Sequence, residues 1–151
     1  MLYKVFQTLN TSFWCDILVK QMHNETRRKV VLKKDPRDGI LSYCKMKHPN
    51  EGILILKGKS KKGVITIDGL VIPPFSYGGQ TYAGFPHSFL PFDLSYVGIV
   101  HSHPTGPADP SVTDMHNFFG LVSLIIKSPY ENNEDIFAWD SNGNSLQIIF
   151  E

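Results

Sequence analysis

A short continuous apolar run at residues 52–56 constrains the fold of this chain most. Its sequence, GILIL, lies between polar segments, which is typical of a strand buried on both faces of a sheet. The lysine-rich residues 57–63 follow it and predict a turn, and residues 64–67 are β-branched at every position. We therefore expect these two strands to form a hairpin.

Two segments carry helical patterns. Pro36 is tolerated in the first turn of a helix, and the apolar positions after it predict a helix over residues 35–46 that ends before His48 and Pro49. Apolar residues recur at spacings of three and four over residues 115–126, which predicts a second, strongly amphipathic helix.

The other apolar runs predict strands. They are residues 13–19, 29–32, 95–102, 136–139 and 146–150. An Asn-Gly turn within residues 140–144 joins the last two strands into a hairpin. Residues 73–91 are rich in glycine, proline and aromatic side chains without either period, so we expect an ordered loop there.

This order of elements predicts an α/β (α+β) fold, in which helices flank a mixed, largely antiparallel β-sheet. A chain of 151 residues can bury one sizeable core but is short for two domains. We expect residues 31–151 to form the domain, and residues 1–30 to be an N-terminal extension to which the sequence assigns no role.

Composition excludes several classes of protein. Fifteen basic and fourteen acidic residues leave a net charge of +1, which cannot hold a polyanion, so we expect no nucleic-acid partner. The N-terminus lacks the pattern of a secretory signal and no apolar stretch is long enough to span a membrane, so we expect a soluble, cytoplasmic protein. Cys15 and Cys44 are too few for a disulfide framework or a thiolate metal site.

Two histidines stand at the end of the strand predicted over residues 95–102. Side chains two apart on a strand share a face, so His101 and His103 could bind one ion, and Pro104 ends the strand beside them. Catalytic zinc usually takes three protein ligands, and Asp114 is the candidate for the third, with Asp109 second.

Ser111 and Asp114 also match a helix capping box, in which the serine is the N-cap. The capping and ligand interpretations can both hold, because a hydroxyl has one donor and two acceptor sites. Hydrolysis at zinc further needs a base, and of the five glutamates only Glu51 opens a strongly apolar strand.

The segment HSHPTGPADPSVTD, with Glu51 upstream, resembles the JAMM metalloproteases, the active MPN-domain proteins, and most of all their short archaeal single-domain members. The resemblance spans roughly residues 31–150 and implies the MPN/JAMM fold, which is cytidine-deaminase-like. It departs from the family at Leu54, where a glycine is common. This departure concerns the approach of Glu51 to the metal and leaves its role as the base in place.

The resemblance implies a zinc-dependent isopeptidase that removes ubiquitin-like proteins from their conjugates. One Zn²⁺ per chain would be bound by His101, His103 and Asp114, with Glu51 as the base and Ser111 stabilising the oxyanion. Aromatic side chains of the loop over residues 73–91 could bind the substrate tail: Phe75, Tyr77, Tyr82, Phe85 and Phe89. The alternatives are a zinc hydrolase that trims the C-terminus of a sulfur-carrier protein and a non-catalytic MPN scaffold. Residues 1–30 could serve as the arm of a homodimer.

Overall fold

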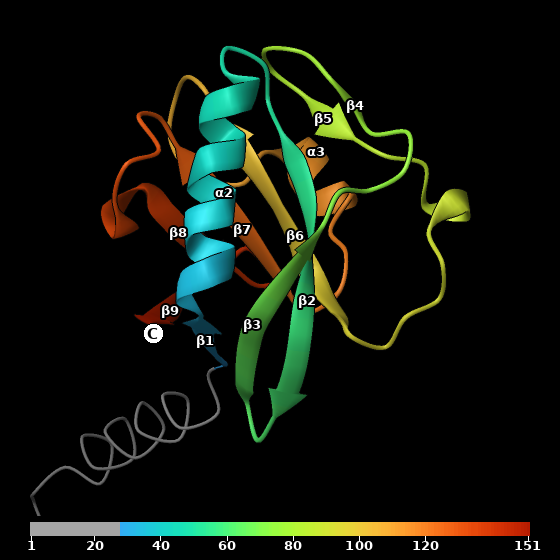
Figure 1. Cartoon of the computed structure of the whole chain (residues 1–151), viewed down its shortest axis with the longest axis vertical. Helices are drawn as coiled ribbons and strands as arrows, with labels where there is room; N and C mark the ends of the chain where they lie inside the picture. The colour runs from blue at the N-terminus through green and yellow to red at the C-terminus, as the bar shows by residue number, and fades with distance from the viewer. Residues whose placement is uncertain (1–27) are drawn as a thin grey trace, which may run out of the picture.

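Seven strands form a sheet that closes on itself in the computed structural model, which describes residues 28–151 (Figure 1). In chain order the strands are β1 Lys29–Leu32, β2 Ile53–Lys61, β3 Val64–Val71, β6 Tyr96–His103, β7 Val122–Lys127, β8 Ile136–Trp139 and β9 Ser145–Phe150. Their order around the sheet is β1-β3-β2-β6-β7-β8-β9, and β1 also pairs with β9. Pairs within the hairpins and between β2 and β6 are antiparallel, whereas β1–β3, β1–β9 and β6–β7 are parallel. The predicted mixed, largely antiparallel sheet is confirmed.

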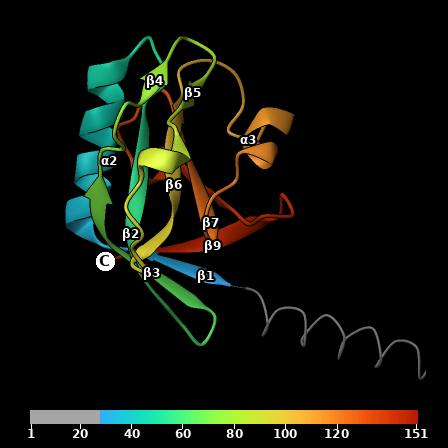
Figure 2. The ribbon, with the colours of Figure 1, turned by 90° about the vertical axis from the view of Figure 1, so that its right-hand side faces the viewer.

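Helix α2, Lys34–Lys47, covers one face of this sheet (Figure 2). Its buried residues Ile40 and Cys44 pack with Leu54 and Val100, which belong to the main core. Because successive residues of a strand point to opposite faces, the residues between them pack on the other side. There Ile53, Ile55 and Ile99 form a second cluster with Phe85.

The loop between β3 and β6 covers this second face. It contains two short paired strands, β4 Tyr77–Gly78 and β5 Ala83–Gly84, and a 3₁₀ helix, His87–Phe89. The structure therefore has more hydrogen-bonded order in this segment than its composition indicated, although it remains a connection between larger strands.

The hairpin of β2 and β3 is longer than the sequence indicated. Both strands continue through the lysine-rich segment, and the turn is limited to Lys62 and Gly63, whose φ angles are 50° and 77°. Two consecutive positive φ angles are typical of the tight turns that match the twist of paired strands. The predicted turn over residues 57–63 was therefore too long.

The amphipathic helix predicted over residues 115–126 was wrong. Helix α3, Val112–His116, is a single short turn, and residues 122–127 form β7, whose first five residues are all buried. Gly120 separates the two with a φ of 78°, and a Cβ atom there would lie 2.7 Å from the Val97 carbonyl oxygen. A helix could not continue through this position.

The remaining predicted elements agree with the structure. The helix over residues 35–46, the strand at residues 29–32 and the final hairpin are all present within one or two residues of their predicted ends. The strand predicted at residues 13–19 lies outside the described residues, as does Cys15. In the described part of the chain, no helix has both the length and the apolar character needed to cross a bilayer.

Candidate metal centre

Two histidines of β6 and one aspartate of α3 converge where β6 ends. Nε2 of His101 lies 3.1 Å from Nε2 of His103 and 3.3 Å from Oδ1 of Asp114. Nε2 of His103 lies 3.6 Å from Oδ2 of Asp114. His101 is buried, and the other two side chains are partly exposed. Two imidazole nitrogens and a carboxylate thus form one compact set of donor atoms.

This set fits a zinc ion. Zinc ligands at about 2.0–2.1 Å in tetrahedral arrangement are separated from one another by about 3.3 Å, and the three distances in the cluster lie close to this value. Imidazole and carboxylate are both zinc ligands, and three protein ligands leave a fourth position for water or substrate. His103 Nδ1 lies 2.8 Å from the Pro107 carbonyl oxygen. Donation to that oxygen leaves the Nε2 lone pair directed at the metal position.

The structure also separates the candidate ligands from a neighbouring aspartate and histidine, Asp109 and His116. Of the described residues, His101, His103 and Asp114 are the group whose donor atoms lie within 4.8 Å of one another, and Asp109 is not part of it. His116 is exposed at the end of α3. Asp114 therefore has the position that the sequence assigned to the third ligand.

Ser111 and Asp114 form the capping box as well. The Ser111 hydroxyl oxygen accepts a hydrogen bond from the Asp114 backbone N–H at 3.1 Å, and Asp114 Oδ2 accepts one from the Ser111 backbone N–H at 2.7 Å. This arrangement uses the hydroxyl of Ser111 as an acceptor and leaves its proton for donation. The cap also fixes the carboxylate of Asp114 beside the histidines.

Charge and burial shift the pKa values of this cluster. Burial alone would raise the pKa of Asp114, but His101, His103 and the Ser111 N–H hold it well below its usual range. Burial alone would lower the pKa of His103, but the facing Asp114 carboxylate and the Pro107 carbonyl raise it above its usual value. The site therefore keeps Asp114 as a carboxylate, the form that binds a metal.

Glu51 lies beside the cluster on the same face of the sheet. The register pairs Ile53 with His101, and continuing it by two residues along each strand brings Glu51 level with His103. Burial raises the pKa of Glu51, and the nearby histidines lower it in part. A carboxyl group with a raised pKa beside a metal position is suited to accept and return a proton.

Ser102 lies between the two histidines and points to the opposite face. It is fully buried, and its hydroxyl accepts a hydrogen bond from the Gly52 N–H at 2.8 Å, while its own N–H donates to the Gly52 carbonyl at 3.1 Å. These two bonds fasten the residue next to Glu51 to the strand that carries the histidines. Leu54 also points to this opposite face, because it pairs with Val100 in the main core. Its side chain therefore does not enter the metal centre.

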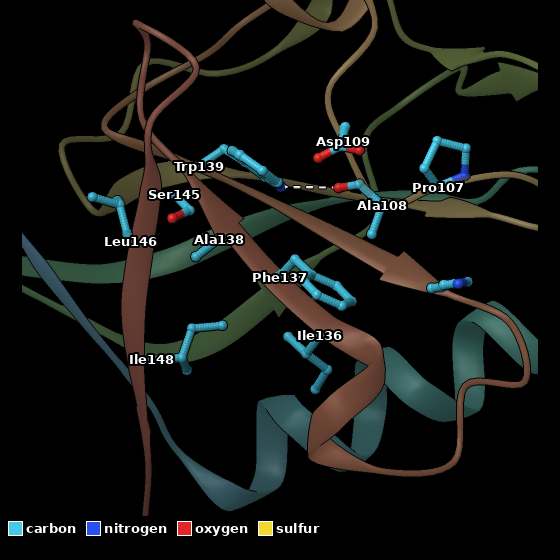
Figure 3. Close-up of a pocket in the computed structure, with 11 residues that line it drawn as sticks. Pro107, Ala108, Asp109, Ile136, Phe137, Ala138, Trp139, Ser145, Leu146 and Ile148 are labelled. Atoms are coloured by element: carbon cyan, nitrogen blue, oxygen red, sulfur yellow. Dashed lines mark hydrogen bonds between the residues drawn. The ribbon is translucent and has the colours of Figure 1, made fainter.

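A tryptophan supports the loop that follows His103. The indole N–H of Trp139 in β8 donates to the Ala108 carbonyl oxygen at 3.1 Å, as Figure 3 shows. The preceding residue is Pro107, whose carbonyl orients His103. Trp139, Ala108 and Pro107 also line an open cavity of about 510 Å³ between this loop and the strands β8 and β9 (Figure 3).

Two further cavities meet at the metal centre. The first, here called the aromatic cavity, has a volume of about 400 Å³ and is lined by Tyr77, Tyr82, Phe85 and His101 among others. The second, here called the Glu51 cavity, has a volume of about 370 Å³ and is lined by Glu51, His103, Asp109 and several small polar residues. Ser111 and Asp114 line both cavities.

The aromatic residues predicted from the loop lie in different places. Tyr77, Tyr82 and Phe85 line the aromatic cavity, and Phe85 is also part of the second core cluster. Phe75 is exposed and packs against Phe89 at a ring distance of 4.9 Å, outside the residues that line this cavity. Of the five predicted aromatic residues, three therefore line the same cavity.

Sequence reasoning missed other residues of the site. His87 stacks on Phe85 at a ring distance of 4.6 Å and lines the aromatic cavity. Gln80 lines the Glu51 cavity, Thr81 lines both cavities, and Trp139 supports the loop beside them. None of these residues belongs to a spacing pattern, so the folded structure was needed to find them.

Comparison with known proteins gives consistent matches. The sequence model of the prokaryotic homologues of the JAB domain matches residues 33–142. A curated protein of Haloferax volcanii named "Probable metalloprotease" is 33% identical over 131 residues, which cover 78% of this chain and 77% of that protein.

Solved structures give the same result at the level of the fold. A structure described as "JAMM: A Metalloprotease-like Zinc Site in the Proteasome and Signalosome" matches with a TM-score of 0.55 and 25% identity, over 82% of this chain and 98% of that one. A JAB1/MPN domain protein from Archaeoglobus fulgidus matches with a TM-score of 0.54 and 23% identity, over 81% of this chain and 96% of that one. The extent of the family match and the identity to the Haloferax protein show that the chain belongs to the prokaryotic homologues of the JAB domain, the metalloprotease-like JAMM/MPN family.

Proposed function

We propose that this protein is a zinc-dependent isopeptidase that hydrolyses amide bonds at the C-terminus of ubiquitin-like proteins. The observation that carries this proposal is the cluster of His101, His103 and Asp114, with Glu51 lining a cavity that reaches two of these ligands. The description of one matching solved structure names a metalloprotease-like zinc site in the proteasome and signalosome. That description supports a protein-modifying substrate class for this chain.

The three ligands would hold a zinc ion through His101 Nε2, His103 Nε2 and a carboxylate oxygen of Asp114. When bound, zinc supplies Lewis-acid chemistry, which polarises an amide carbonyl and makes water available as a nucleophile near neutral pH. His103 is kept in the required tautomer by its hydrogen bond to the Pro107 carbonyl.

Glu51 would act as the general base and then as the general acid. It accepts one proton from the attacking water as the water oxygen bonds to the carbonyl carbon. It returns that proton to the nitrogen as the carbon–nitrogen bond breaks, so the products are a carboxylic acid and an amine. The raised pKa of Glu51 favours this exchange near neutral pH.

Ser111 would stabilise the oxyanion formed during attack. Its hydroxyl oxygen already accepts a hydrogen bond from the Asp114 N–H, so its proton is the group left to donate. Ser111 lines both cavities, which supports a position for its hydroxyl beside the oxygen of a carbonyl bound where the cavities meet. Loss of one such donor typically lowers the rate by about 10²- to 10³-fold.

The aromatic cavity would hold the tail that leads to the scissile carbonyl. Tyr77, Tyr82 and Phe85 supply apolar walls, and the backbone of β5 runs along the same cavity. An extended tail that ends in small residues fits such a channel, because main-chain hydrogen bonds to a strand do not depend on side chains.

The test compares the wild-type chain with Glu51→Gln and with Glu131→Gln as a matched control at an exposed loop position. Each protein is loaded with zinc, its metal content is measured, and cleavage of ubiquitin-like conjugates is followed with and without a chelator. We expect Glu51→Gln to keep one zinc per chain and to lose about 10²- to 10⁴-fold in rate, and Glu131→Gln to behave as the wild type.

Full activity of the Glu51→Gln variant would show that Glu51 is not the general base. A zinc-loaded wild type that trims a sulfur-carrier protein but leaves every ubiquitin-like conjugate intact would overturn the substrate class. Tight binding of conjugates without any hydrolysis would instead indicate a scaffold.

A further inference from the structure

We propose that the Glu51 cavity binds the amine side of the substrate, and that Asp109 selects a positively charged residue beside the lysine whose side-chain nitrogen is released. This inference rests on the proposed function and names a substrate preference of the same site.

The two cavities reach the metal centre from different sides. The aromatic cavity is lined by His101, and the Glu51 cavity is lined by His103 and Glu51. Thr81, Ser111 and Asp114 are common to both linings, and Asp114 belongs to the ligand cluster, so the two cavities meet beside that cluster. A substrate that crosses the metal position would occupy one cavity on each side of its scissile bond.

Proton transfer determines which cavity holds the amine side of the scissile bond and which holds the carbonyl side. When the amide bond breaks, the nitrogen must take a proton from the group that received it from water. Glu51 lines only one of the two cavities, and proton transfer needs hydrogen-bond distance. The nitrogen and the residues attached to it therefore belong in the Glu51 cavity, and the carbonyl side belongs in the aromatic cavity.

One negatively charged residue that lines the Glu51 cavity, Asp109, has no role in the proposed hydrolysis. The lining contains no lysine or arginine. The Asp109 side chain is exposed and has no hydrogen bond or ion pair with any residue in the described part of the chain. Asp109 also lines the open cavity of Figure 3, whose lining includes Lys127, but no hydrogen bond or ion pair joins the two among the described residues, so the carboxylate is available to a substrate.

The loop that carries Asp109 is held by a hydrogen bond to the preceding residue, Ala108. The Ala108 carbonyl accepts the hydrogen bond from Trp139, and Figure 3 shows the Asp109 side chain next to this contact. The Pro107 carbonyl faces His103. A carboxylate on such a supported loop favours a cation at a defined place and disfavours an anion there, which gives specificity.

The first test measures, for the wild type and for each variant, the ratio of the kcat/KM values of two conjugates, one basic and one acidic. Two conjugates join the same ubiquitin C-terminus to the lysine side chain of either the tripeptide Arg-Lys-Arg or the tripeptide Glu-Lys-Glu. We expect the wild type to have the higher kcat/KM for the basic conjugate. Replacing Asp109 by Asn should reduce the ratio by about 3- to 10-fold, as expected for one partly screened charge, and Asp109→Lys should invert it.

The control is Asp68→Asn, which removes one exposed negative charge from β3 outside the cavity linings. Its ratio should equal that of the wild type. Equal kcat/KM values for the two conjugates in the wild type, or an unchanged ratio in Asp109→Asn, would overturn the assignment of Asp109.

The second test does not depend on turnover. Zinc-loaded Glu51→Gln protein is titrated with the two free tripeptides, which correspond to the amine product, and backbone amide shifts are followed by NMR. The basic tripeptide should shift the amide of Thr105, which lines the Glu51 cavity, and not that of Asn117, which lines the aromatic cavity.

These outcomes separate the two proposals. An enzyme inert toward all conjugates whose Thr105 amide still responds to the basic tripeptide would overturn the proposed function and support the cation subsite. Cleavage of conjugates with no response at Thr105, or with a response only at Asn117, would overturn the subsite and leave the isopeptidase function in place.

Discussion

Ser102 shows how a residue outside the ligand set can determine the geometry of the centre. It lies between the two histidines of β6, yet its side chain faces the main core, where the Cys44 thiol lies close enough to interact with it. Burial raises the pKa of that thiol to about 12, so Cys44 contributes packing and no nucleophile. The hydrogen bond from Gly52 to the Ser102 hydroxyl is the link between this core and Glu51.

The first prediction compares Ser102→Thr with Ser102→Val, which add the same volume at a fully buried position but differ in the hydroxyl. The valine leaves the Gly52 N–H without its acceptor, so the segment that carries Glu51 keeps only its backbone bonds, from Ser102 N–H to the Gly52 carbonyl and from Glu51 N–H to the Gly79 carbonyl. We expect Ser102→Val to lower kcat by about 10- to 100-fold with KM and zinc content unchanged, and Ser102→Thr to retain most of the activity. Equal loss in both variants would mean that only packing matters at this position.

The ligand residues could be predicted from the sequence because their pattern is local. His101, His103, Ser111 and Asp114 lie on one strand end and the following turn, and strand alternation and helix capping bring such residues together. Asp109 and Trp139 could not be placed in the same way. Their positions depend on contact between segments 31 residues apart, which no short pattern contains.

At the scale of elements, the connection from β6 to β7 shows the limit of periodicity. A buried strand and a buried helix are both continuously apolar, so the spacing over residues 115–126 fitted a helix although residues 122–127 form β7. The positive φ of Gly120 and its close approach to Val97 exclude a continuous helix through this segment. By contrast, the hairpin ending in β9 was predicted correctly, because the Asn-Gly turn between its strands is specific.

The second prediction concerns the contact between β8 and the loop after His103. Trp139→Phe keeps an aromatic ring but removes the N–H that donates to the Ala108 carbonyl. We expect zinc affinity to fall by up to about 10-fold, as for other groups that orient a metal ligand indirectly. The measurement is a competition titration of zinc against a chelator of known affinity.

The control for this change is Phe137→Leu, which alters a more exposed ring on the same strand. Its zinc affinity should match that of the wild type. If both variants bind zinc equally well, the indole hydrogen bond has no influence on the metal centre.

At the scale of the whole molecule, the metal centre joins parts that the sheet alone leaves separate. His101 and His103 belong to β6, in the middle of the sheet, and Asp114 belongs to α3, a turn with no buried residues of its own. A metal bound there would fasten α3 to the sheet. The closure of the sheet by β1 and β9 was not predicted, because it depends on pairing between residues more than 110 positions apart.

The third prediction is that zinc stabilises the folded chain. A ligand that binds only the folded state at 1,000 times its Kd adds about 4 kcal/mol, which raises the Tm by about 10 °C for a chain of this size. A chelator should reverse this shift in a thermal unfolding experiment.

Two variants make that experiment specific for Asp114. Asp114→Asn should abolish the response of the Tm to zinc, because a ligand is lost. Asp109→Asn should keep the full response, because Asp109 is not part of the ligand cluster. The opposite pattern would assign the third ligand to Asp109.

The pairing of β1 with both β3 and β9 also bears on the order in which the molecule folds. Ring closure between distant residues is slow, since it requires a large loss of chain entropy before the contact forms. The metal ligands lie within fourteen residues of sequence, Glu51 joins them only when β2 pairs with β6, and β1 gains its second neighbour from residues 147–150. We therefore expect a folding chain to capture its metal early, to acquire its base later and to complete its sheet last, so that an intermediate could carry zinc while still lacking hydrolytic activity.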